Sequence, residues 1–293
     1  MTVTASSTDE SLGTPAAKVN GTSYLTLREA VAAYNRQPGS ELHLLRDVEV
    51  EGGLEFTSPG DVALDQHTLT TSGGMSFRAN GNIRLRSGLT GGIQNTGGGP
   101  AVVVGSGCHL LVRPITISGG SAGIQVLSGG SAEVEFFFGE MKVAIKNVDY
   151  GIRVEKGGNL TLGGGSPEIK GTTADLYLGE GVVVKAMGFA NQDRTKTFTV
   201  EAFDPAPVKI AVTAPDGGMG VEQLTDYTFT PVNAAWYAEA VGDVPVSKEV
   251  FIKPYMIRLD PTGKAADPND YTIWRCSTGG RTMTRRRSKD TCS

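Results

Sequence analysis

A glycine-punctuated phrase recurs along the chain between Gly98 and Glu180. Copies begin at Ala101, Gly123 and Gly151, and each has a small residue, a short alternating strand, a glycine-rich turn and a second apolar run. A further copy begins at Ala174. The starts lie roughly two to three dozen residues apart, a period typical of solenoid proteins.

Such a unit cannot bury its apolar side chains alone, because each short strand needs a neighbour above and below it. Stacked coils with like strands paired in parallel meet this need. Glycine suits the corners, where the chain turns sharply and a side chain would be strained. The 40 glycines among 293 residues agree with many corners. We therefore predict an all-β fold, a right-handed parallel β-helix of about six coils.

One amphipathic helix precedes the repeats. Thr26 and Glu29 have the spacing of a capping box, in which both side chains satisfy free backbone amides at a helix start. Leu27, Ala30, Val31 and Tyr34 recur at helical spacing, and Pro38 and Gly39 follow. We expect this helix to cap the first coil and to cover its open strand edge.

The pattern divides the chain into four parts. Residues 1–18 are a polar linker, residues 19–181 are the β-helix with its N-terminal capping helix, residues 182–273 are a β-rich C-terminal region and residues 274–293 are a disordered basic tail. The third part is either a last irregular coil with a cap or a separate β-rich module. Predicted strands before the repeats are Leu42–Val50 with a turn at Arg46, Leu54–Phe56, Val62–Leu64, His67–Leu69, Met75–Phe77 and Asn82–Arg86.

The stretch from Val19 to Glu180 resembles the repeat-rich β-helical regions of bacterial cell-surface and adhesin-like proteins, which are pectin-lyase-like. The segment Asn20–Ala30 resembles the family's lead into a helix, and Leu42–Val50 and Val62–Leu69 resemble its first strands. Gln66 departs from the Asn-Gly that the family usually has before His-Thr-Leu. The resemblance implies a fold and leaves the chemistry open, because such helices occur in lyases, hydrolases, adhesins and passive stalks.

Composition argues against several partners. The 27 basic and 31 acidic side chains give a net charge of −4, so we expect no nucleic-acid partner, and the basic tail Arg281–Lys289 is interpreted as solvated. No apolar run is long enough to span a membrane as a helix. The start of the chain lacks a basic-then-apolar signal sequence. An extracellular or bacterial cell-surface location therefore implies a signal outside this chain or already removed.

Metal and cofactor signals are weak. Cys108, Cys276 and Cys292 form no Cys-x-x-Cys pair, so neither a zinc site nor a disulfide scaffold is predicted. The three histidines, which are His43, His67 and His109, lack the spacing of a metal site. No nucleophile elbow or phosphate loop is present. We predict no cofactor and no metal.

Carbohydrate-active enzymes are the main catalytic alternative. A calcium-dependent lyase would need carboxylates clustered on adjacent coils, and no Asp occurs from Gly73 to Asn147. A glycoside hydrolase would need a close pair of carboxylates, for which Asp61 and Asp65 are the nearest candidates. Asp65 lies in a predicted turn, which favours a structural role. No catalytic residue is assigned.

A carbohydrate-binding wall needs fewer specific groups than an enzyme site. Exposed aromatic rings contact the faces of sugars, and polar groups bind their hydroxyls. The candidate wall residues are Arg84, Arg86, Phe137, Lys146, Arg153 and Tyr177. A solvated wall without a ligand is the competing interpretation for each of them.

The sequence thus favours a non-enzymatic, secreted or surface-attached protein. It would act as an adhesin-like wall for a polysaccharide, a host or cell-surface glycan or a protein, or as a rigid spacer. The alternative is a polysaccharide lyase or glycoside hydrolase of the pectin-lyase type. A tail-spike-like protein is a third reading and would be a trimer; the sequence leaves the oligomeric state open.

Overall fold

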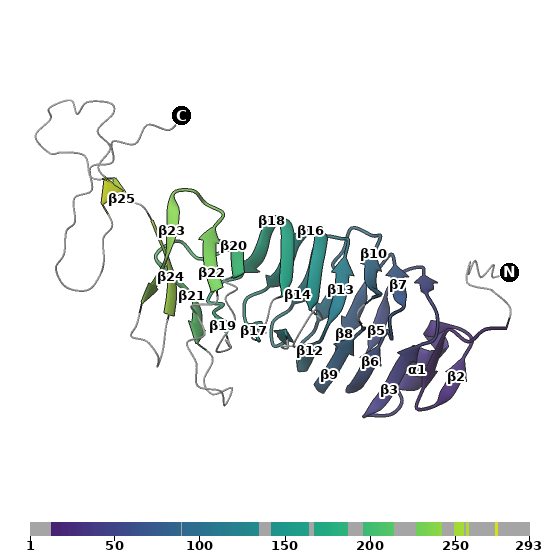
Figure 1. The fold of residues 1–293 in the computed structure, drawn as a ribbon. Helices are drawn as coiled ribbons and strands as arrows, with labels where there is room; N and C mark the ends of the chain where they lie inside the picture. The colour runs from purple at the N-terminus through teal and green to yellow at the C-terminus, as the bar shows by residue number, and fades with distance from the viewer. Residues whose placement is uncertain are drawn as a thin grey trace, which may run out of the picture.

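The computed structural model describes residues 13–88, 90–134, 142–163, 167–186, 196–213, 227–241, 249–254, 256–257 and 273–274. Short strands stack into an elongated parallel β-solenoid of about six turns, with one short helix at its N-terminal end (Figure 1). The predicted fold class is therefore confirmed. Phe137, the linker before residue 13 and the basic tail after residue 274 lie outside the described residues.

Two large sheets form the walls. The first contains, in spatial order, β2 (Thr22–Tyr24), β1 (Ala17–Val19), β3 (Ser40–Leu44), β6 (Gly60–Ala63), β9 (Gly81–Arg86), β12 (Cys108–Val112), β15 (Ser131–Val134), β17 (Asn159–Leu162), β19 (Val184–Ala186), β21 (Val208–Thr213), β24 (Glu249–Pro254) and β23 (Trp236–Val241). From β3 to β21 every neighbouring pair in this sheet is parallel.

The second sheet has two arms that meet at one long strand, β16 (Val143–Val154). One arm contains β4 (Val48–Val50), β7 (Thr68–Thr71), β10 (Gly92–Asn95) and β13 (Ile115–Ser118). The other contains β5 (Leu54–Phe56), β8 (Met75–Phe77), β11 (Val102–Val104) and β14 (Ala122–Val126). Beyond β16 the sheet continues through β18 (Glu168–Leu178), β20 (Lys196–Ala202) and β22 (Tyr227–Pro231).

Each central coil therefore has three strands, whereas the repeat phrase indicated two clearly. The strands β10 and β13 were not predicted. β10 spans four residues between glycine-rich corners, and Ile93 is its single large apolar residue. One apolar residue gives no alternation, so the sequence carries little signal for this strand.

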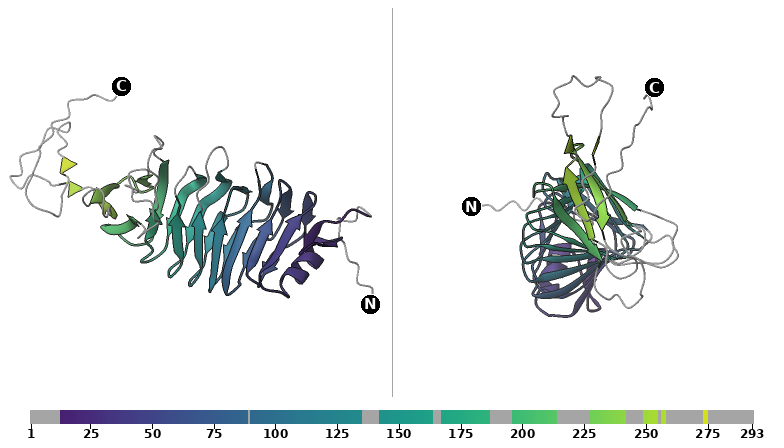
Figure 2. Two further views of the ribbon diagram at one scale, coloured as in Figure 1. Left: turned by 60° about the horizontal axis from the view of Figure 1, so that its bottom comes forward. Right: turned by 90° about the vertical axis from the view of Figure 1, so that its left-hand side faces the viewer.

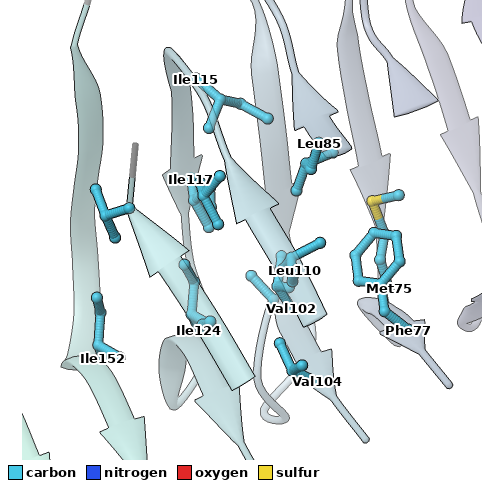
Figure 3. Close-up of a cluster of buried hydrophobic side chains, with 14 of the residues drawn as sticks. Met75, Phe77, Leu85, Val102, Val104, Leu110, Ile115, Ile117, Ile124 and Ile152 are labelled. Carbon is cyan, nitrogen blue, oxygen red and sulfur yellow. The ribbon is translucent and has the colours of Figure 1, made fainter. Parts of the chain in front are cut away.

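The interior consists of columns of apolar side chains, one from each coil. Because the strands pair in register, Met75, Val102, Ile124 and Ile152 stack along the axis (Figure 3). All four are at most 1 % exposed. Burial of these columns drives the stacking, since apolar area removed from water contributes about 25 cal/mol per Å².

Glycines occupy the corner where the chain passes from the second sheet to the first, between β11 and β12, β14 and β15, and β16 and β17, as the repeat predicted. Gly107, Gly129 and Gly157 have φ angles of 78°, 75° and 77°. Side-chain-bearing residues are strained at such angles, so glycine is required there. The Gly107 amide donates to the Gly129 carbonyl at 2.9 Å, and the Gly129 amide donates to Gly157 at 2.9 Å. The corners therefore bond to one another along the axis.

The helix α1 (Leu27–Tyr34) caps the N-terminal end of the solenoid (Figure 2). Both hydrogen bonds of the predicted capping box between Thr26 and Glu29 are present. The helix buries the four apolar residues that its periodicity predicted. Tyr34 meets Phe56 edge to face, with ring centroids 5.4 Å apart, and Phe56 stacks on Phe77 in the next coil at 5.1 Å. Through Tyr34 the helix thus continues the column of aromatic rings formed by Phe56 and Phe77.

Parallel pairing continues past residue 181, where β19 pairs with β17 and β20 pairs with β18. Antiparallel strands follow, because β24 joins β21 and β23 joins β24. A separate two-stranded sheet contains β25 (Met256–Ile257) and β26 (Ile273–Trp274). The described strands up to β24 thus belong to the two large sheets.

Candidate functional site

Outward-facing residues of the second sheet stack in columns, as the inward ones do. Gln125 on β14, Arg153 on β16, Tyr177 on β18 and Glu201 on β20 are partners in register. Neighbouring strands lie about 4.8 Å apart, so this column brings four side chains from four coils into reach of one another. Tyr150 lies at the start of the same arm of β16.

These side chains form one continuous network, which we call the aromatic–arginine wall. The Arg153 guanidinium carbon lies 4.7 Å from the Tyr177 ring centroid and 5.7 Å from that of Tyr150. The two tyrosine rings meet at 5.6 Å with an interplanar angle of 68°. Cation–π and edge-to-face contacts of this kind each contribute about 0.5–1.5 kcal/mol. The rings are therefore held in fixed orientations.

Carboxylates complete the wall at both ends. Arg153 Nε donates to Glu155 Oε1 at 2.7 Å, and Gln125 Nε2 donates to the same oxygen at 2.8 Å. The hydrogen bond to Glu155 raises the pKa of the Arg153 guanidinium, which stays charged. At the other end the Tyr150 hydroxyl donates to Glu201 Oε2 at 3.2 Å. Burial, with Glu201 adding to it, raises the pKa of that hydroxyl.

An exposed aromatic ring extends the wall beyond Glu201. Phe203 is 62 % exposed, and its amide donates to the Leu178 carbonyl at 2.8 Å. The amides of Gly179 and Glu155 make the equivalent bonds one and two coils earlier, so Glu155, Gly179 and Phe203 stack in one column. Gly179 contributes no side chain between the other two. The Phe203 ring is thus open to solvent beside a polar wall.

The predicted wall residues do not form a single site. The structure brings Arg153 and Tyr177 together. Lys146 is exposed on the other arm of β16, where it pairs in register with Ser118. Arg84 and Arg86 lie on β9 in the first sheet. Phe137 lies outside the described residues.

Sequence reasoning did not single out Phe203, Tyr150 or Glu201. The alternation of buried and exposed residues in β20 could have indicated that Glu201 and Phe203 face outward. Phe198 and Val200 are buried in β20, so the opposite parity, which includes Glu201 and Phe203, faces outward. The outward orientation of Tyr150 could not be predicted from alternation, because the register of β16 against β18 shifts on both sides of Val148.

A second charged cluster lies on the first sheet. Arg84 Nη1 lies 3.0 and 2.9 Å from the two oxygens of Asp61. His43 Nδ1 lies 2.5 Å from Asp65 Oδ2, and Arg86 Nη1 lies 3.7 Å from Asp65 Oδ1. Both candidate hydrolase carboxylates therefore have cationic or imidazole partners on neighbouring strands.

Asp65 also has a backbone role. Asp65 and Gln66 have φ angles of 45° and 72°, and the His67 amide closes the turn on the Leu64 carbonyl at 2.8 Å. Asp and Asn tolerate this left-handed conformation better than other side chains. The residue thus lies in a tight turn between β6 and β7, where the sequence placed one.

Within the described ranges, no three His, Cys, Asp or Glu residues are grouped so that they could hold a metal ion. No helix in the same ranges is long and apolar enough to cross a membrane.

The fold and the wall together define a parallel β-solenoid with a structured aromatic and charged face. No family model, curated protein or solved structure matches the chain.

Proposed function

We propose that this protein is a non-enzymatic, extracellular or cell-surface binding protein, adhesin-like in action, whose aromatic–arginine wall binds carbohydrate. The observation that carries the proposal is the continuous network from Gln125 to Glu201 with the open Phe203 ring at its end. Sugar rings present an apolar face and a rim of hydroxyls. An exposed aromatic ring beside fixed hydrogen-bonding groups fits both features.

The solenoid supports such a role mechanically. Its strands are hydrogen-bonded from coil to coil in two long sheets. The glycine corners are also hydrogen-bonded from one coil to the next. A wall on this scaffold keeps its groups in position before a ligand arrives, which lowers the entropic cost of binding. The elongated shape also suits a spacer that presents the wall away from a surface (Figure 2).

A glycan-array screen of the purified protein tests the proposal, with Phe203→Ala as the decisive variant. Leu25→Ala is the matched control, because Leu25 is 60 % exposed and lies at the N-terminal end. We expect Phe203→Ala to weaken glycan binding about 2- to 12-fold, the size of one lost aromatic contact. Leu25→Ala should leave it unchanged. Absence of glycan binding in the unchanged protein would refute the carbohydrate proposal.

A carbohydrate-active enzyme is the second candidate, and the cluster around Asp61 and Asp65 favours it. Asp61 and Asp65 are 24 % and 36 % exposed, and His43 and two arginines lie beside them. Shortened or unsaturated products released from polysaccharides, and lost in Asp65→Asn, would support the enzyme. Turnover that survives Asp65→Asn would exclude this cluster as its source.

A further inference from the structure

Phe203 has an acidic residue on each side of it in the sequence. Glu201 precedes it by two residues near the end of β20, so their Cα atoms are about 7 Å apart or less, and Asp204 follows it directly. Glu201 accepts a hydrogen bond from the Tyr150 hydroxyl at 3.2 Å. Asp204 accepts one from the Gly181 amide at 2.7 Å. Both donors are neutral groups, so neither hydrogen bond places a positive charge beside these side chains.

Two cations of the preceding coils form ion pairs with other carboxylates. Arg153 pairs with Glu155 at 2.7 Å, and Lys156 pairs with Glu180 at 2.7 Å. Among the side chains that the structure describes, none with a positive charge forms an ion pair with Glu201 or Asp204. The paired charges cancel, and the two carboxylates beside Phe203 leave a local excess of negative charge.

We propose that this end of the wall selects glycans that carry ammonium groups, that is amino-sugar chains, over neutral and acidic ones. The inference rests on the proposed carbohydrate binding and adds the class of ligand. An ammonium group over an exposed aromatic face is attracted by the ring, and nearby carboxylates add to that attraction. The same carboxylates repel a uronate chain.

The aromatic ring and the carboxylates have separate roles, which makes the inference testable. Phe203 contacts any sugar through its ring and sets the overall affinity. Glu201 and Asp204 act on charge and set the preference. Glu201→Gln and Asp204→Asn keep an oxygen that can accept the bonds from Tyr150 and Gly181, so the local backbone is preserved.

The test compares three hexasaccharides of similar size, namely β-1,4-linked glucosamine, its fully N-acetylated form and oligogalacturonate. Binding is measured by calorimetry at about pH 6, where amines are protonated, in about 0.02 M and about 0.5 M salt. We expect the glucosamine chain to bind about three- to tenfold more tightly than the N-acetylated chain at low salt, the size of exposed charge contacts.

The double variant Glu201→Gln, Asp204→Asn should bind both chains equally, and high salt should have the same effect in the unchanged protein. Glu49→Gln combined with Glu51→Gln is the matched control, because it removes the same charge from exposed positions on and beside β4. It should retain the preference.

Each outcome decides between the two proposals. Equal binding of all three chains would overturn the charge preference and leave carbohydrate binding intact. A preference that persists in the double variant would overturn the assignment to these two carboxylates. If none of the three chains binds and the glycan array is also silent, carbohydrate binding itself is refuted.

Discussion

Asp175 is the buried carboxylate on which the fold depends most clearly. The residue is 2 % exposed and lies in β18. Its oxygens accept hydrogen bonds from the Gly171 amide at 3.1 Å and the Thr199 amide at 2.9 Å. The Lys170 ammonium lies 3.1 Å away. The side chain therefore joins two adjacent coils.

Asp175→Ala would leave two backbone amides without an acceptor. Each unmet buried donor costs about 1–3 kcal/mol, which gives a loss of about 2–6 kcal/mol. Water entering the vacated volume would recover part of this loss. The lysine side chain is 59 % exposed, so its ion pair adds little. We expect the free energy of unfolding to fall by about 3 kcal/mol.

Urea unfolding followed by circular dichroism measures this change, and hydrogen exchange of the Thr199 amide localises it. Asp149→Ala is the control, because Asp149 is exposed in the preceding coil and should change stability by less than about 0.5 kcal/mol. Asp175→Asn keeps one acceptor oxygen and should lie between the two. If Asp175→Ala lies within about 1 kcal/mol of the control, the carboxylate does not hold the coils together.

Two further perturbations test the interior. In Gly151→Ala the new methyl group would overlap the Ile169 side chain, so we expect a loss of about 1–3 kcal/mol by thermal unfolding. Gly98→Ala meets nothing within 4 Å, and equal melting temperatures for both variants would contradict the packing. Burial raises the pKa of Cys108 to about 11, so its contribution to stability is lost as pH rises from the unfolded value toward 11. Mass spectrometry after iodoacetamide treatment at about pH 8 should show Cys108 labelled in urea and protected in the native protein; equal labelling would contradict its burial.

The repeat phrase predicted the coils because stacking depends on local patterns. A small residue, alternating Val, Ile or Leu and a glycine turn recur at Ala101, Gly123 and Gly151, and each begins a coil. The capping box and the apolar face of α1 were also predicted, since both depend on residues close in sequence. The four-residue strand β10 was missed because its composition carries no period.

The wall could be predicted only in part. Alternation showed that Arg153 would face outward, but Tyr177, whose ring lies nearest its guanidinium, comes from the next coil. The offset between coils varies with insertions, and β16 shifts register on both sides of Val148. No local rule gives that shift, so the contact between Arg153 and Tyr177 could not be derived.

The sequence by itself determined the strand periods, the glycine corners, the cap and the class of fold, because each arises from interactions within about one coil. The tertiary structure decided which outward side chains meet. Gln125, Arg153, Tyr177 and Glu201 are separated by two dozen residues or more, and only the parallel register places them side by side. In a solenoid the core is specified locally, while a site on its wall depends on how successive coils align.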